Sequence, residues 1–408
     1  MAHTTSQPLT ADSVNTVSSS IASLIRPLGV VGAIAMVVAL VLSATMQEGW
    51  ARFLYSYTVS YSFVLSMCVG AIFFITLQHL TRAGWSALVR RQAEILTFGF
   101  FPLAVLCLPL VLSVLGGNAS LMIWNSPEAV ASNALLQHKT PYLNTGFYLI
   151  RFVVYFIAWI GISRLYISLS ARQDVSANPK NSLLMEKLSA PSLFILALTV
   201  TFASIDLLMA LEPIWFSTIF GVYYFAASMV AFFSILTIST VLLQRAGYLT
   251  KAINAEHYHD IGKLLFGFNC FWGYIAFSQY ILIWYANIPE ETQWYLARQE
   301  NGWEYIAIIL IVGHFVIPFL GLLSRNVKRN PDKLLFWACW LLVMGWIDMY
   351  YLGMNSHAPS PVFGLIDIAI LVGIACLALS GVLSMAYRYR LIAVGDPRLQ
   401  ESINFHNL

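Results

Sequence analysis

Charged residues are scarce in this sequence. Only 10% of its 408 residues are Asp, Glu, Lys or Arg, against about one quarter in soluble domains, whereas 59% are apolar. This balance excludes a soluble globular protein. Because a transmembrane helix needs roughly 20 mostly apolar residues, the apolar residues (59% of 408, about 240) leave room for around ten spans.

The sequence also lacks the marks of several functional classes. The net charge is only +3 and the basic residues are scattered, so no nucleic-acid partner is expected. The five cysteines all lie in apolar runs without CxxC or CxxCH spacing, which indicates small buried apolar residues. There is no P-loop, GxGxxG turn or hydrolase triad. We therefore predict no catalytic residues, metal site or redox cofactor in this chain, and a quinone or a lipid is the ligand that it can take.

Apolar runs bounded by charged residues, Pro or Gly predict an all-α membrane protein with ten transmembrane helices. The first 25 residues carry no Lys or Arg and so lack the basic region of a signal peptide. We expect a disordered tail at 1–26, a transmembrane domain at 27–388 and a C-terminal tail at 389–408. The predicted spans are 27–46, 54–78, 95–115, 144–169, 190–211, 216–243, 261–285, 303–323, 333–352 and 364–386.

Basic residues indicate the orientation, because cytoplasmic loops hold an excess of Lys and Arg. Of the 22 Lys and Arg residues, 18 fall at the ends of the predicted spans that share one side. That side also receives both ends of the chain, so we predict that the N- and C-termini are cytoplasmic.

An internal repeat is visible in the predicted spans. Asp206, near the outer end of the fifth span, is followed by Gly221 after 15 residues, and Asp348 in the ninth span is followed by Gly364 after 16. Helices two to five then match helices six to nine as two four-helix bundles, with the first and tenth helices as a flanking pair.

Ionisable residues within the spans are few, and each costs about 2.5–3.5 kcal/mol on insertion scales. In one interpretation, Arg151 pairs with Asp206 or another nearby acid and only balances its charge. In the other, the buried acids and histidines form a proton relay, because a desolvated carboxyl can both take and give a proton. The relay candidates are Asp206, His314, Asp348 and Asp367 within spans, and Glu212 and His357 just above them.

The cytoplasmic end of the seventh span is dense in titratable residues. His259, Asp260 and Lys263 lie there and are followed by Asn269. Asn269 shares one helix face with Gly273, Ala276 and Tyr280, which predicts an entrance for protons or water. The alternative is structural: His259 and Asp260 cap the helix, and small residues on this face serve tight packing.

Three long stretches resemble the ActF-type membrane subunits of alternative complex III, which are similar to the NrfD/PsrC polysulfide-reductase membrane subunits. They are QHLTRAGWSALVRRQAE at 78–94, LSAPSLFILALTVTFASIDLLMALEPIWFSTIFGVYY at 188–224 and HDIGKLLFGFNCFWGYIAFSQYILIWYANIPEE at 259–291. The resemblance extends over about 55–388 and implies ten helices in two bundles plus a flanking pair, in the inner membrane of a bacterium.

The resemblance also implies a function. Such a chain is a subunit, without a redox cofactor of its own, of a respiratory quinol:cytochrome c oxidoreductase that delivers electrons to a cytochrome c or a terminal oxidase. The expected partners are an ActC-like quinol-oxidising subunit, the haem c subunits ActA and ActE, the iron-sulfur subunit ActB, ActD and lipids. The chain would support the ActC-like subunit and conduct protons, with Asp206, His314 and Asp348 as candidates by their position.

Two other functions stay open at this point. Parallel repeats and charges near the midplane also suit a secondary transporter. Alternatively, the chain itself binds and oxidises quinol, with Asp206 or His314 as the proton acceptor. Whether the chain has an enzymatic activity of its own is not decided by the sequence.

Overall fold

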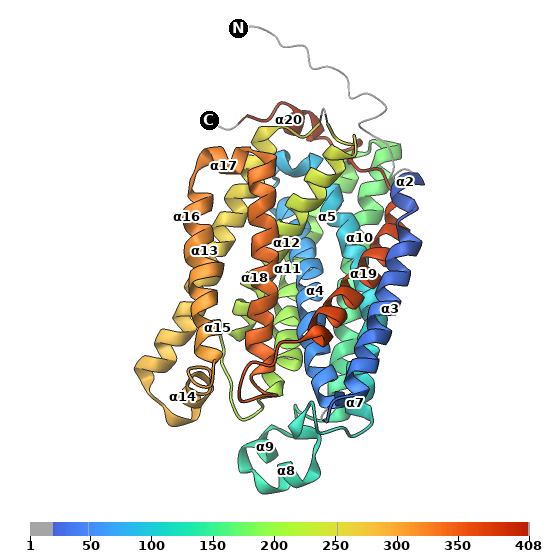
Figure 1. Cartoon of the computed structure of the whole chain (residues 1–408). Coiled ribbons are helices and arrows are strands. Elements are labelled where there is room, and N and C mark those ends of the chain that lie inside the picture. The colour runs from blue at the N-terminus through green and yellow to red at the C-terminus, as the bar shows by residue number, and fades with distance from the viewer. Residues whose placement is uncertain (1–18, 48, 251, 407–408) are drawn as a thin grey trace.

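The chain is all-α in the computed structural model, which describes residues 19–47, 49–250 and 252–406. Nine helices or runs of helices in this part are long and apolar enough to cross a membrane, which defines a multi-pass membrane protein. At one end of the molecule lie α2 (Ser19–Ala22) and α20 (Leu399–Ile403), and at the other end α8 (Pro127–Ser132) and α9 (Ala134–Lys139) (Figure 1). We call these ends the terminal face and the opposite face.

The nine spans follow the predicted order closely. They are α3 (Ile25–Ala44), α4 (Gly49–Leu80), the run from α5 to α7 (Arg90–Leu115), α10 (Thr145–Ser176), the run from α11 to η4 (Pro179–Leu211), α12 (Phe220–Arg245), the run from α15 to α16 (Trp303–Leu323), α18 (Pro331–Met354) and α19 (Leu365–Ala386).

The helix α13 (Ala255–Ala286) is not among the nine, although it has 32 residues and packs along α12. Its buried face carries polar residues, among them His257, Asn269 and Gln279, and these lower its mean hydropathy. The seventh predicted span, 261–285, therefore coincides with a helix whose polar residues face the protein interior.

Several helices begin well before the apolar runs that predicted them. Asn178 and Asn254 are the N-cap residues of two such helices, α11 and α13, and each side chain accepts at least one backbone N–H of the first turn. The caps start helices in polar sequence that hydropathy alone assigns to loops. Asn144 and Asn330 cap α10 and α18 in the same way, where the helices begin close to the predicted starts. Most of the predicted N-terminal tail lies outside the described residues, and α3 begins at Ile25.

The centre of the molecule is the pair α4 and α12. They pack against each other, and each also contacts α11 and α18. Of the apolar windows of the spans, those of α4 and α12 are the most buried, at 89% and 72%. On one side of this pair lie α5 to α7, α10 and α11, and on the other α13, α15, α16 and α18, while α3 packs along α19 at the edge (Figure 1).

Two spans that the sequence predicts as continuous are interrupted. The third consists of α5 (Arg90–Leu96), η2 (Thr97–Gly99), α6 (Phe100–Leu106) and α7 (Leu108–Leu115). The eighth consists of α15 (Trp303–Ile309), a π turn η5 (Leu310–Val316) and α16 (Ile317–Leu323). Pro102, Pro109 and Pro318 lie in these segments, and a proline inside a helix removes one donor and clashes with the carbonyl four residues earlier.

Gly70 permits the close contact between the central helices. A Cβ at this position would lie 2.3 Å from the Cβ of Phe232 and 2.5 Å from the carbonyl oxygen of Ser228 on α12. Small residues allow two membrane helices to approach closely, because packing rather than hydrophobic burial drives their association.

Residues 388–405 after α19 form a strap over the terminal face. The hydroxyl of Ser402 donates to the carbonyl of Trp85, which lies in η1 (Gly84–Leu88), at 2.5 Å. The same hydroxyl lies 3.4 Å from Nε2 of His257, at the start of α13. One buried serine of this terminal strap therefore contacts both halves of the molecule.

We predict that Gly70→Val destabilises the fold, because valine cannot fit between α4 and α12 without separating them. Overpacking of this kind costs about 1–3 kcal/mol. A lower thermal unfolding temperature of the detergent-solubilised protein would show it. The control is Gly161→Val on α10, where an added Cβ meets no atom within 4 Å. Equal losses from both variants would contradict the packing explanation.

Candidate functional site

Three buried ion pairs lie in the half of the molecule nearer the opposite face. Arg52 pairs with Asp367 at 2.5 Å, Arg151 with Asp206 at 2.8 Å, and Arg298 with Glu212 at 2.9 Å. Each guanidinium is at most 7% exposed. A buried charge is tolerated when it is paired and hydrogen-bonded, so these pairs explain how this region holds six ionised groups.

Asp206 is the most completely bonded of the three acids. Arg151 donates to both of its carboxylate oxygens at 2.8 Å, Tyr155 donates at 2.7 Å and Tyr142 at 3.2 Å. Arg151 and Tyr155 are one turn apart on α10, so both reach the same carboxylate on α11. The guanidinium carbon also lies 3.9 Å from the ring centroid of Tyr142. The sequence left several acids as possible partners of Arg151, and in the structure its partner is Asp206.

Asp367 has a local structural role. Its carboxylate accepts from Arg52 at 2.5 Å, from Ser56 at 2.6 Å and from the backbone N–H of Gly364 at 2.8 Å. The last contact satisfies a donor just before α19 begins, and the others fasten α19 to α4. Every oxygen of this predicted relay residue is therefore bonded within the anchor of the flanking pair.

Asp348 occupies the corresponding position in the second half of the molecule, but its surroundings differ. Its side chain is completely buried and accepts from the hydroxyl of Tyr223 on α12 at 2.5 Å and from the indole N–H of Trp272 on α13 at 3.0 Å. None of the ion pairs between described residues includes it. Both partners are neutral, so no fixed positive charge compensates this carboxyl group.

His314 lies next to the Asp348 site. Its ring stacks on that of Trp272 with the centroids 3.8 Å apart, and the residue is completely buried. Neither ring nitrogen has a hydrogen-bond partner in the described part of the chain, and the same is true of both amide atoms of Asn269, one turn away from Trp272 on α13. Buried polar atoms are almost always hydrogen-bonded, to protein or to water, so these two side chains are exceptions among the buried polar groups of the described chain.

The residues of the predicted cytoplasmic entrance lie near the start of α13. Asp260 forms an ion pair with Lys263 one turn along α13. The helix is capped by Asn254 rather than by His259 or Asp260, because the Asn254 side chain accepts the N–H groups of Glu256 and His257. His259 and Asp260 thus lie in the second turn of α13, beyond its cap.

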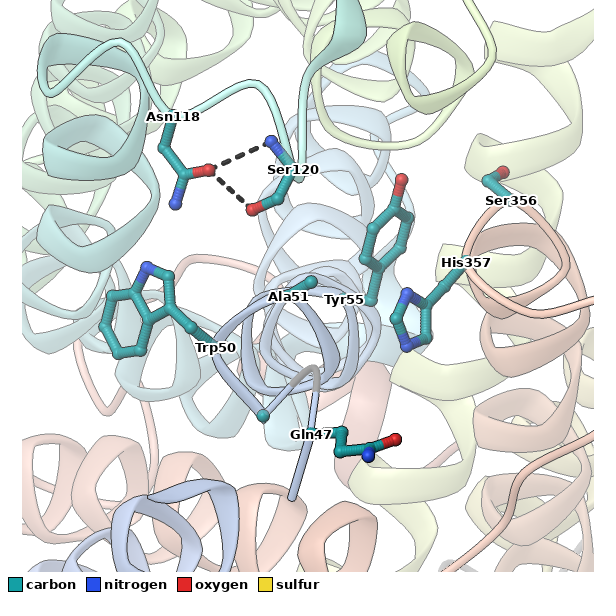
Figure 2. A pocket seen from close by; sticks show the side chains of 9 residues that line it. Gln47, Trp50, Ala51, Tyr55, Asn118, Ser120, Ser356 and His357 are labelled. Atoms are coloured by element: carbon teal, nitrogen blue, oxygen red, sulfur yellow. Dashed lines mark hydrogen bonds between the residues drawn. The ribbon is translucent and has the colours of Figure 1, made fainter. Parts of the chain in front are cut away.

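His357 lines a cavity of about 540 Å³ at the opposite face, and Glu212 bonds to Ser356 of its lining. Figure 2 shows Asn118 and Ser120 on one side of this cavity and Ser356 and His357 on the other, with Tyr55 between them. His357 stacks on Tyr55 with the ring centroids 4.9 Å apart, and Ser356 donates to Glu212 at 2.7 Å. Among the residues that the structure describes, the lining includes amides, hydroxyls and aromatic rings but no Asp, Glu, Lys or Arg.

The predicted relay residues therefore do not form one cluster. Asp348 and His314 meet at Trp272, whereas Asp206, Asp367 and Glu212 belong to separate ion pairs. Arg52 and Arg298 lie outside the predicted spans, and the structure buries both. Only the position of Arg52 carried a signal, because Ser56 follows it at helical spacing. The described residues contain no group of three or more His, Cys, Asp or Glu that could hold a metal ion.

A second charged cluster lies at the terminal face. Arg91 pairs with Glu94 and with Asp174, both at 2.9 Å, while Arg90 pairs with Asp396 of the terminal strap. Burial opposes ionisation of Asp396, but the charges and hydrogen bonds of Arg90 and Arg398 together outweigh it and lower the pKa of Asp396. The cluster attaches the strap to α5 and α10 by charge.

Comparison with models of known protein families and with curated protein sequences gives no match. The assignment to the ActF-type subunits therefore remains a proposal.

We predict that Arg151→Met destabilises the protein by about 3–5 kcal/mol, because it leaves the Asp206 carboxylate buried without its cation. Thermal unfolding of the solubilised protein measures the loss. The double variant Arg151→Met/Asp206→Asn should recover much of it, since the uncompensated charge is then gone. If the double variant is less stable than the single one, charge compensation is not the role of Arg151.

The terminal strap should depend on pH through Asp396. Because the folded protein lowers the pKa of Asp396, its contribution to stability is complete above its unfolded pKa of about 3.9 and is lost as the pH falls through the folded value. Asp396→Asn should lower the free energy of unfolding at pH 7 by about 1–3 kcal/mol, and the variant should therefore unfold at a lower temperature. The difference between wild type and variant should shrink below about pH 4, and a difference that is constant from pH 7 to pH 3 would contradict this assignment.

Proposed function

We propose that this chain is an ActF-like integral subunit of an alternative complex III type quinol:cytochrome c oxidoreductase in a bacterial inner membrane. It supports the ActC-like quinol-oxidising subunit, carries no redox cofactor of its own and conducts protons. The electron carriers belong to the partners: haem c in ActA and ActE, and iron-sulfur clusters in ActB. ActD and a terminal oxidase complete the assembly.

The proposed architecture has ten spans, with α13 as the tenth. Helices α4 to α11 form one four-helix bundle, α12 to α18 form the other, and α3 and α19 are the flanking pair. The contacts of α4 and α12 with each other and with both α11 and α18 support a pseudo-twofold arrangement of the bundles. The excess of Lys and Arg toward the terminal face supports cytoplasmic termini.

The observation that carries the proton-conducting role is Asp348. A buried carboxyl group without a cationic partner is costly when ionised, so it readily takes a proton. The hydroxyl of Tyr223 and the indole of Trp272 stabilise the carboxylate when the proton leaves. Both protonation states therefore have support, as a relay residue requires.

Asp206 does not have this property. The guanidinium of Arg151 bonds to both of its oxygens, so protonation of Asp206 would leave a buried cation without its partner. We therefore assign Asp206 to the structure of the first bundle and Asp348, with His314 and Asn269, to the proton route. His259, Asp260 and Lys263 are its proposed entrance from the cytoplasm.

A second candidate function, quinone binding by this chain, is favoured by one observation. A cavity of about 530 Å³ lies between α10 and α11, with mostly aromatic and aliphatic walls, and it reaches Arg151 and Tyr155. A quinone that co-purifies with the isolated chain would support this function over a purely structural first bundle.

We predict that Asp348→Asn leaves the complex assembled but lowers its proton uptake per electron, because proton transfer through this site slows by about 100-fold. The complex is purified through a tag on this chain and reconstituted in vesicles that hold a pH indicator. Asp206→Asn, the matched change in the other bundle, should reduce assembly while the assembled fraction keeps its proton yield.

Each outcome bears on the proposal. Co-elution of haem and iron-sulfur subunits supports the respiratory assignment, whereas a colourless single-chain particle that transports a solute favours a secondary transporter. An unchanged proton yield in the assembled Asp348→Asn complex would remove Asp348 from the route.

A further inference from the structure

The eighth span contains a π turn at Leu310–Val316, and its hydrogen bonds are shifted by one residue. The N–H of Ile317 donates to the carbonyl of Val312, five residues back, instead of to that of Gly313. Pro318 favours this register, because in an α-helix its ring would meet the carbonyl of His314 and its nitrogen has no hydrogen to donate. π turns of this kind occur frequently at functional sites.

The shift frees the carbonyl of Gly313, and a side chain from another helix uses it. The indole N–H of Trp340 on α18 donates to this oxygen at 2.7 Å. Gly313 permits the approach, since a Cβ there would already lie 3.0 Å from the sulfur of Met344. Trp340 and the N–H of Ile317 are thus alternative donors to one carbonyl group.

The register of this turn sets the direction of His314, the next residue. In the observed register the imidazole lies on the ring of Trp272, 3.8 Å between centroids, and Trp272 in turn donates to Asp348 at 3.0 Å. An α-helical register would displace His314 by about 100° around the helix axis, the angle of one residue in a turn of 3.6. The imidazole would then leave Trp272.

We propose that Trp340 is a positioning residue: by occupying the carbonyl of Gly313 it holds the π turn open and keeps His314 stacked on Trp272, beside Asp348. Pro318 acts in the same direction by denying the α-helical register one of its donors. Release of the Trp340 hydrogen bond lets Ile317 return to Gly313 and turns His314 away. The contact between η5 and α18 thereby controls the site, so a movement of either segment switches it.

The role of this switch in proton conduction rests on the proposed function, but the switch itself does not. With His314 on Trp272, its unpartnered nitrogens belong to a ring stacked on the indole that donates to Asp348. With His314 turned away, the proposed route loses this ionisable neighbour of Trp272.

The test first removes the proline and then measures whether Trp340 alone preserves the π turn. In the Pro318→Ala variant, Trp340 still bonds Gly313, so we expect the π turn and the stack on Trp272 to persist. In Pro318→Ala/Trp340→Phe both constraints are gone, and we expect a continuous α-helix with His314 displaced from Trp272. The control is Pro318→Ala/Trp337→Phe, since the Trp337 indole packs on Gly321 and donates no hydrogen bond within the described chain.

Each variant is purified with its complex, and its structure is determined by electron cryomicroscopy alongside the proton yield per electron. A π turn that survives in Pro318→Ala/Trp340→Phe overturns the proposal, and so does rewinding in the Trp337 control. Rewinding with a severalfold lower proton yield supports both the switch and the relay. Rewinding with an unchanged yield supports the switch and overturns the role of His314 in the proposed function.

A second measurement keeps the proposal testable if the double variant does not assemble. In Trp340→Phe alone, amide hydrogen exchange in the segment 310–318 should be faster than in wild type, because the turn has lost one of its two constraints. Exchange should be unchanged in Trp337→Phe. Equal exchange in wild type and Trp340→Phe would count against Trp340 as the residue that holds the turn.

Discussion

The cost of placing charge away from water governs the arrangement of this molecule. Six ionised groups near the opposite face are acceptable because they form three guanidinium–carboxylate pairs, each with further hydrogen bonds. These pairs also decide which helices must lie together: Arg151 and Asp206 join α10 to α11, and Arg52 and Asp367 join α4 to α19. The same constraint makes the exception informative, since Asp348 is buried without any such partner.

The two halves of the molecule use the same position for different purposes. Asp206 and Asp348 lie on α11 and α18, which make corresponding contacts with the central pair. In the first half an arginine neutralises the acid permanently, and the surrounding tyrosines only add to its fixation. In the second half neutral donors surround the acid, and a histidine with free nitrogens stacks on one of them. Under the proposed function, a structural role and a proton-transfer role are thus divided between the two halves.

Hydropathy and spacing predicted most of the fold, and the reasons for the differences are physical. An apolar run marks the part of a helix that lies in hydrocarbon, so the N-cap residues Asn178 and Asn254 start α11 and α13 earlier than hydropathy indicates. The burial of Arg52 and Arg298 could not be predicted, because it depends on Asp367 and Glu212, which are far away in sequence. The spacing of Asp206 and Asp348 indicated equivalent positions, but only tertiary contacts distinguish a compensated acid from an uncompensated one. The π turn likewise needs Trp340 from another helix, although Pro318 marked its place.

The terminal strap has a consequence for how the protein is made. Ser402 contacts Trp85 in η1 and His257 at the start of α13, and it is synthesised after every described span. The spans can therefore enter the lipid phase before these contacts exist, so insertion and closure of the terminal face are separate events. The last step of folding at this face is then the docking of a polar segment onto helices that are already in place.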